Sequence, residues 1–301
     1  MLKPAVLLVA TVLTVGLGGC AGTTADPAAD GVIRVVASTN VYGDLAELIG
    51  GPYVEVTSVI DDPAQDPHEF EANARVQLAV SRADVVIVNG GGYDDFMGTM
   101  LDASGNEDAI VVTAVDAYPQ EPDVGDEGFN EHVWYDYEAM VGVVGRISGA
   151  LSEVDPQLER KFTGTMFTLT GLLQGLGADA DLAAETVAGS GVIVTEPVPL
   201  YLLDRMGLEN LTPSEFSDAV EEDTDVAPAV LRDVLDRIRD GSVDLVVYNA
   251  QTGGPLTDAV LEAAEAEGVP AVAVSETLPE GMHYVGWQQS VQRDIVEALD
   301  G

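Results

Sequence analysis

Short apolar runs alternate with segments of helical periodicity along most of the chain. The runs are rich in Val and Ile and are typical of buried strands, whereas the segments between them repeat apolar positions at helical spacing. The predicted strands are 32–38, 54–60, 83–89 and 109–114, followed by 191–196, 243–250 and 270–276. The predicted helices are 40–50, 73–82, 94–103, 198–206, 228–240, 256–267 and 284–299. This alternation predicts an α/β fold with two lobes, each with a mainly parallel sheet flanked by helices.

One stretch between the two series lacks strand alternation. Asp155-Pro156 opens it with a proline at a helix-start position, and the sequence continues without a strand pattern to about Val187. Four glycines oppose a continuous helix, since each costs about 1 kcal/mol relative to alanine, and a break near Gly175–Gly177 is allowed. We therefore predict an N-terminal lobe at 32–154, a linking helix at 155–187 and a C-terminal lobe at 188–301.

The first 31 residues have a different character. Residues 1–19 carry one lysine and then an apolar run too short and too rich in glycine for a stable membrane span, which indicates an export signal. Leu17-Gly18-Gly19-Cys20 resembles the bacterial lipobox, so we expect Cys20 to be lipidated and residues 20–31 to form a flexible tether. Cys20 is the only cysteine, which excludes an intrachain disulfide. The expected location is extracytoplasmic, anchored to the bacterial cell membrane by lipid.

Composition adds mainly an exclusion. The 301 residues are 47% hydrophobic, enough for packed cores in two lobes. Fifty-two acidic residues against twelve basic ones give a net charge of −40. A surface this acidic repels phosphate groups, so nucleic acid and anionic membrane surfaces are poor partners.

Two histidines and two glutamates are candidate metal ligands. His68 and His132 lie in turn-like segments, and Glu196 and Glu276 directly follow apolar strand-like runs. The four lie 64, 64 and 80 positions apart, which rules out a local zinc-finger-like motif. Open α/β sheets present ligand groups at the ends of their strands, so such residues can still meet. Taken alone, each has a simpler interpretation as an ordinary surface or core residue.

The motifs around these residues resemble those of a known family, the zinc/manganese-type substrate-binding lipoproteins of ABC importers (solute-binding protein family 9). The resemblance runs from about Val32 to the C-terminus, and the motifs that carry it are QDPHEFEA, ADVVIVNGGG, NEHVWYD, Asp155-Pro156 and VTEPVPLYLLDRMGL. It implies two α/β lobes joined by a rigid long helix, with one metal ion in the cleft between them.

The resemblance also implies a ligand set. The first and second family histidines match His68 and His132, and the third ligand, five residues before a tyrosine, matches Glu196. Glu276 fits the fourth, where the family more often has aspartate. Two further departures are the lack of the histidine-rich loop of many zinc-type members, and Asn130-Glu131 where the family has Asp-Pro.

Two neutral imidazoles and two carboxylates would carry a charge of −2, which cancels a divalent ion. Because carboxylates can bind through both oxygens, this set suits the higher coordination of Mn2+ better than tetrahedral Zn2+. We expect Mn2+, less readily Fe2+, with Zn2+ as the serious alternative.

Three functions fit these features. The leading hypothesis is a monomeric binding protein that delivers its ion to the membrane permease of an ABC importer. A lipid-anchored metalloenzyme with a His2Glu2 site is the alternative, although the chain has no HExxH or GxSxG motif. A structural lipoprotein or adhesin would need no metal.

Three further features are weaker candidates for a functional role. We expect His283 to be a capping or surface residue, Gly90-Gly91-Gly92 to form a tight turn lining the cleft, and Glu221-Glu222-Asp223 to be a solvated charge run.

Overall fold

The computed structural model describes residues 31–62, 70, 73–118 and 129–301. Residues Val32–Gly301 form one compact unit. The predicted signal peptide, Cys20 and His68 lie outside the described residues, as does the predicted tether apart from Gly31. Within the described part, none of the helices combines the length and the apolar character needed to cross a membrane.

The N-terminal lobe is built on a four-stranded parallel sheet in the order β2-β1-β3-β4. Its elements are β1 (Ile33–Thr39), α1 (Asn40–Gly50), η1 (Gly51–Tyr53), β2 (Val54–Ile60), α2 (Ala74–Val80), β3 (Val85–Val88), α3 (Asp95–Ser104), β4 (Ile110–Thr113), η2 (Val115–Ala117), η3 (Val133–Tyr135) and α4 (Tyr137–Val154). Successive residues of a strand face opposite sides, so both faces need cover. Val35 and Val85 pack in the core that includes α1 and α4, whereas Val36 and Val86 pack with α2 and α3.

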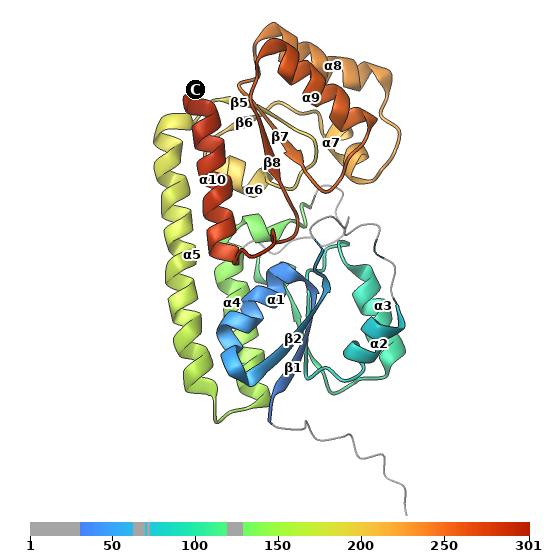
Figure 1. The fold of residues 1–301 in the computed structure, drawn as a ribbon, viewed down its shortest axis with the longest axis vertical. Coiled ribbons are helices and arrows are strands. Elements are labelled where there is room, and N and C mark those ends of the chain that lie inside the picture. The colour runs from blue at the N-terminus through green and yellow to red at the C-terminus, as the bar shows by residue number, and fades with distance from the viewer. Residues whose placement is uncertain (1–30, 63–69, 71–72, 119–128) are drawn as a thin grey trace, which may run out of the picture. The chain divides into compact units, whose positions relative to one another are not determined.

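The C-terminal lobe repeats this plan with a parallel sheet in the order β6-β5-β7-β8. Its elements are β5 (Gly191–Val194), α6 (Leu200–Arg205), β6 (Glu209–Asn210), α7 (Ser214–Glu221), α8 (Pro228–Asp240), β7 (Leu245–Asn249), α9 (Pro255–Glu267), β8 (Ala271–Val274) and α10 (Tyr284–Asp300). Ile193 and Val246 pack under α7, α8 and α9, and Val192 and Val247 face the core shared with α5, α6 and α10. Figure 1 shows the two sheets with their helices. The predicted fold class is confirmed.

A single continuous helix, α5 (Glu159–Val187), connects the two series of elements. It packs against α1 and α4 and also against α6 and α10. The break allowed near Gly175–Gly177 does not occur. Arg205 explains why glycine occupies position 177. The Arg205 Nε donates to the Gly177 carbonyl at 3.1 Å, and a Cβ on residue 177 would lie 2.8 Å from the Arg205 guanidinium. Arg205 also forms a two-point ion pair with Asp181, which fixes α6 against α5.

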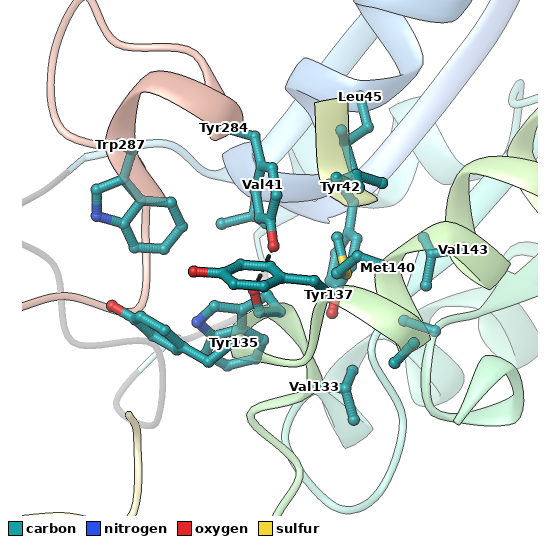
Figure 2. Close-up of a cluster of buried hydrophobic side chains, with 14 of the residues drawn as sticks. Val41, Tyr42, Leu45, Val133, Tyr135, Tyr137, Met140, Val143, Tyr284 and Trp287 are labelled. Atoms are coloured by element: carbon teal, nitrogen blue, oxygen red, sulfur yellow. Dashed lines mark hydrogen bonds between the residues drawn. The ribbon is translucent and has the colours of Figure 1, made fainter. Parts of the chain in front are cut away.

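One hydrophobic core spans elements of both lobes, as the close-up in Figure 2 shows. Tyr42 of α1, Tyr135 of η3, and Tyr284 and Trp287 of α10 are all buried there. The Tyr284 hydroxyl donates to the Trp134 carbonyl. The Tyr137 hydroxyl, at the start of α4, donates to Oε1 of Gln288 on α10 at 3.0 Å. The hydroxyls of Tyr284 and Tyr137 are therefore hydrogen-bonded inside an apolar contact between the lobes.

The short 3-10 helices η1, η2 and η3, the helices α4 and α7, and the two-residue strand β6 were not predicted. α4 contains three glycines and several β-branched residues, which lower helix propensity, but its buried face packs against α1 and α5. Asp136 also caps it, since its carboxylate accepts from the backbone N–H groups of Glu138 and Ala139 at 2.8 and 3.1 Å. Tertiary packing and a cap thus outweigh the poor local propensity.

Candidate metal centre

His132 lies in the loop that leads from β4 to α4 and is completely buried. Its Nδ1 is 2.7 Å from Asn130 Oδ1, which also accepts from the His132 backbone N–H at 3.0 Å. The imidazole contacts the rings of Tyr93 and Trp134, with centroids 6.0 and 5.0 Å away. The ring is therefore held in one orientation by an amide on one side and aromatic residues on the other.

Glu196 and Glu276 each lie two residues beyond the end of a strand, β5 and β8 respectively. Asn249, the last residue of β7, lies between them, and its Nδ2 donates to Glu196 Oε2 and to Glu276 Oε1 at 2.7 Å each. All three side chains are buried. The Thr252 hydroxyl donates to the other Glu196 oxygen. Parallel strands end at the same edge of a sheet, which is why residues far apart in sequence converge here.

Gln251 shapes the loop that carries Glu276. Its Oε1 accepts from the backbone N–H groups of Glu276 at 2.6 Å and Thr277 at 3.1 Å. Its Nε2 donates to the Thr277 hydroxyl at 2.9 Å. The end of β7 and the loop after it therefore hold both glutamates. Asn249 and Thr252 hydrogen-bond their carboxylates, and Gln251 hydrogen-bonds the backbone of Glu276.

Tyr93 connects this group to the N-terminal lobe. Burial, and then the charge of Glu276, raise the pKa of Tyr93 well above its usual value. Tyr93 follows Gly90, Gly91 and Gly92, which all have positive φ angles of 71–99°. Three successive positive φ values favour glycine strongly, so this turn has the sequence that its backbone requires.

Glu221, the last residue of α7, extends the cluster. Its Oε1 lies 3.2 Å from Nε2 of His132, and its side chain is 12% exposed. Ligand atoms of Glu131, His132 and Glu221 all lie within 4.8 Å of one another. Burial, and then the charges of Glu131, Glu196 and Glu276, raise the Glu221 pKa to about 9. Four carboxylates and one imidazole thus converge, an arrangement that a cation would stabilise.

A cavity of about 720 Å³ opens beside this cluster. Gly92, Glu131, Glu221, Gln251 and Thr252 are among the residues that line it. It is therefore bounded by loops of both lobes and by residues that contact the candidate ligands.

Three of the four candidate ligands are described, and each lies in this cluster. Glu196 and Glu276 share the Asn249 amide, and Tyr93 contacts the His132 ring and interacts electrostatically with Glu276. The fourth, His68, lies outside the described residues, so the complete ligand set stays a prediction. The expectation of a solvated run at Glu221-Glu222-Asp223 is wrong for Glu221 and holds for the other two residues, which are exposed.

Sequence reasoning also missed Asn249, Thr252 and Tyr93. Asn249 ends a predicted strand, like the candidate ligands, and that position was the one available signal. His283 lies where it was expected, exposed and at the start of α10, with its Nδ1 2.5 Å from Asp44 Oδ1.

Residues 35–298 match the model of the family described as "Zinc-uptake complex component A periplasmic", ZnuA. The chain belongs to the ZnuA family. Membership confirms the resemblance to metal-binding ABC substrate-binding proteins. The ZnuA family consists of solute-binding components, so the chain is not an enzyme and the metalloenzyme alternative is wrong.

Among relatives of this ZnuA-family chain, the manganese-binding lipoprotein MntA of Bacillus subtilis (strain 168) is 32% identical over 154 residues, which cover 50% of this chain and 50% of MntA. The match thus spans about half the length of that relative. The manganese ABC transporter substrate-binding lipoprotein PsaA of Streptococcus pneumoniae is 22% identical over 251 residues, covering 79% of this chain and 78% of PsaA.

Solved structures agree on the fold of this ZnuA-family chain. The crystal structure of ZnuA superposes with a TM-score of 0.75 at 17% identity, covering 89% of this chain and 99% of that one. A Mn-bound periplasmic metal binding protein from Candidatus Liberibacter asiaticus gives a TM-score of 0.72 at 16% identity, with the same coverage. At these identities the likeness supports the fold alone.

Proposed function

We propose that this chain binds one divalent transition metal ion, Mn2+ in preference to Zn2+, outside the cytoplasm and delivers it to the permease of an ABC importer. The observation that carries the proposal is the convergence of buried metal-binding groups at the strand ends. The fully buried imidazole of His132 lies beside the carboxylates of Glu131 and Glu221 at the edge of a cavity, and the charges of Glu196 and Glu276 act on Glu221. A buried group of like charges is costly without a cation, and two carboxylates with two imidazoles would balance a divalent one.

The proposed ligands are His68, His132, Glu196 and Glu276. His132 is suited to this role because Asn130 contacts its Nδ1 and orients the ring so that Nε2 faces the carboxylate of Glu221. Asn249 and Thr252 hold the glutamates from outside, as the second layer of a metal site commonly does.

Manganese is preferred because the candidate donors are mainly oxygen. Carboxylates can supply two oxygens each and suit harder ions with five or six ligands, whereas Zn2+ favours four-coordinate nitrogen and sulfur sites. The names of MntA and PsaA refer to manganese, although MtsA of Streptococcus pyogenes is named as an iron binding lipoprotein and the family model refers to zinc. Fe2+ and Zn2+ are therefore the competing ions.

The delivery step is proposed from family membership and from the lipobox-like sequence that ends at Cys20. A lipid on Cys20 would keep the protein at the outer surface of the membrane, and residues 21–31 would let it reach a permease.

Metal binding tests the central part of this proposal. Protein stripped with chelator is titrated with Mn2+ and Zn2+ by calorimetry, and bound metal is counted after dialysis. The wild type should bind one ion per chain, His132→Ala should bind at least about a hundredfold more weakly, and His283→Ala should bind like the wild type. His283 is a suitable control because it is exposed and pairs with Asp44 away from the candidate site. Equal binding by both variants would refute the assignment of His132, and no binding by wild type would refute the function.

A further inference from the structure

Glu221 is not among the ligands that the family resemblance implies, yet it lies against one of them. Its Oε1 is 3.2 Å from His132 Nε2, and its carboxylate is largely buried while the neighbouring Glu222 is exposed. The position follows from α7. Phe216 anchors this helix in the core of the C-terminal lobe, and Ser217, one turn before Glu221 on the same helix face, is buried as well.

The atom that Glu221 contacts is the metal-binding atom of His132. Asn130 donates through Nδ2 to the Pro197 carbonyl at 3.0 Å, so its Oδ1 faces the imidazole. An oxygen accepts, and Nδ1 must therefore carry the proton. The lone pair of His132 Nε2 then points toward Glu221. An ion bound there would be shared by His132 Nε2 and Glu221 Oε1.

The surroundings of Glu221 disfavour a negative charge unless a cation is present. It is the last residue of α7, where the carbonyl end of the helix repels anions. Glu131, Glu196 and Glu276 add their own negative charge close by. Since side chains at surface positions can turn away into water, an inward carboxylate at a helix C-terminus indicates a role with an ion.

We propose that Glu221 is a further ligand of the transported metal, supplied by α7 beside His132. This rests on the proposed function, because it assigns a residue to the same site. A third carboxylate beside those of Glu196 and Glu276 suits the five or six positions of Mn2+ or Fe2+ better than the tetrahedral preference of Zn2+. The third carboxylate makes the site richer in hard oxygen donors than the resemblance alone implies.

Glu221→Gln tests the proposal, with Glu222→Gln as the matched control. Both changes replace a carboxyl group with an amide at neighbouring positions and keep the length of the side chain. Glu221→Gln keeps a side chain that can hydrogen-bond His132, so a purely structural role would survive. Calorimetry with Mn2+ should give a Kd at least about tenfold weaker for Glu221→Gln, or 1.4 kcal/mol. Glu222→Gln should stay within about twofold of wild type.

A second measurement separates a ligand from a residue that only positions His132. The relaxation of solvent protons by bound Mn2+ reports water molecules directly on the ion. Glu221→Gln should raise this relaxation per bound ion, because water takes the vacated position, whereas Glu222→Gln should not. Equal Kd values for the two variants would overturn the proposal, as would weaker binding with unchanged relaxation. If the wild type itself binds no metal, the proposed function fails; if it binds and Glu221→Gln binds equally, only the role of Glu221 fails.

Discussion

Replacing Asn249 with leucine should destabilise the metal-free protein by an unusually large amount for one amide. Its Nδ2 is 2.7 Å from an oxygen of Glu196 and 2.7 Å from an oxygen of Glu276, so these two oxygens are at most about 5.4 Å apart. Leucine has nearly the same volume and leaves both carboxylates without this donor. Asn106→Leu is the control, because Asn106 also donates twice, but to the uncharged carbonyls of Val80 and Ala83.

The magnitude follows from charge. Two ionised carboxylates 5.4 Å apart repel each other by about 3 kcal/mol at an effective dielectric constant of 20. Two hydrogen bonds to charged acceptors, at about 1.5–3 kcal/mol each, give a similar lower limit. Two bonds to neutral carbonyls are worth only about 1–3 kcal/mol together, and less where they are partly exposed. We expect Asn249→Leu to lose about 3 kcal/mol or more and Asn106→Leu about 1 kcal/mol.

Urea unfolding in the presence of chelator measures the difference. Both tryptophans, Trp134 and Trp287, are buried, so intrinsic fluorescence follows loss of the core. The melting temperature of Asn249→Leu should fall by about 6 °C or more, since each kcal/mol shifts it by roughly 2 °C in a chain of this size. If both variants lose the same stability, the amide does not hold two charged carboxylates and the reasoning is wrong.

Three other changes test separate parts of the molecule. Glu196→His should raise the ratio of Zn2+ to Mn2+ affinity at least about tenfold, because it replaces an oxygen donor with nitrogen; an unchanged ratio in calorimetry would remove Glu196 from the ligand set. The Asp44 hydrogen bond raises the pKa of His283, so the stability it contributes is complete below pH about 6.5 and is lost as the pH rises through the raised value. His283→Asn should therefore melt slightly below wild type at pH 6 and together with it at pH 9, and a difference that grows with pH would contradict this. Cys20→Ser should release the protein from membranes without changing its metal affinity; finding the mature variant still in the membrane fraction would refute the anchor.

The sequence predicted the two parallel sheets because their central strands β1, β3, β5 and β7 are largely buried and therefore rich in Val and Ile. β1 and β5 have this character, and each begins a lobe. It did not predict α4, whose glycines and valines have poor helix propensity in isolation. Packing against α1 and α5 determines that helix, and such packing has no local signature in sequence.

The candidate ligands were predictable for a related reason. Glu196 and Glu276 directly follow apolar strands, so their position in the fold can be read from the pattern around them. Glu221 follows no strand and stands beside two exposed acidic residues, from which its sequence does not distinguish it. What brings it to His132 is the path of α7, set by the burial of Phe216. The role of Asn249 is likewise visible only in the structure, where its amide donates to the carboxylates of Glu196 and Glu276.

The core shared by the two lobes limits how an ion can enter and leave. Parting the lobes would expose Tyr42, Tyr135, Tyr284 and Trp287, which are now buried. Exposing four such rings would cost roughly 15 kcal/mol, at about 25 cal/mol per Å² and 150 Å² or more for each. That is as much as the whole free energy of unfolding of a typical protein. A wide hinge motion that exposed these rings would therefore be too costly, and under the proposed function the ion would exchange with little relative movement of the lobes.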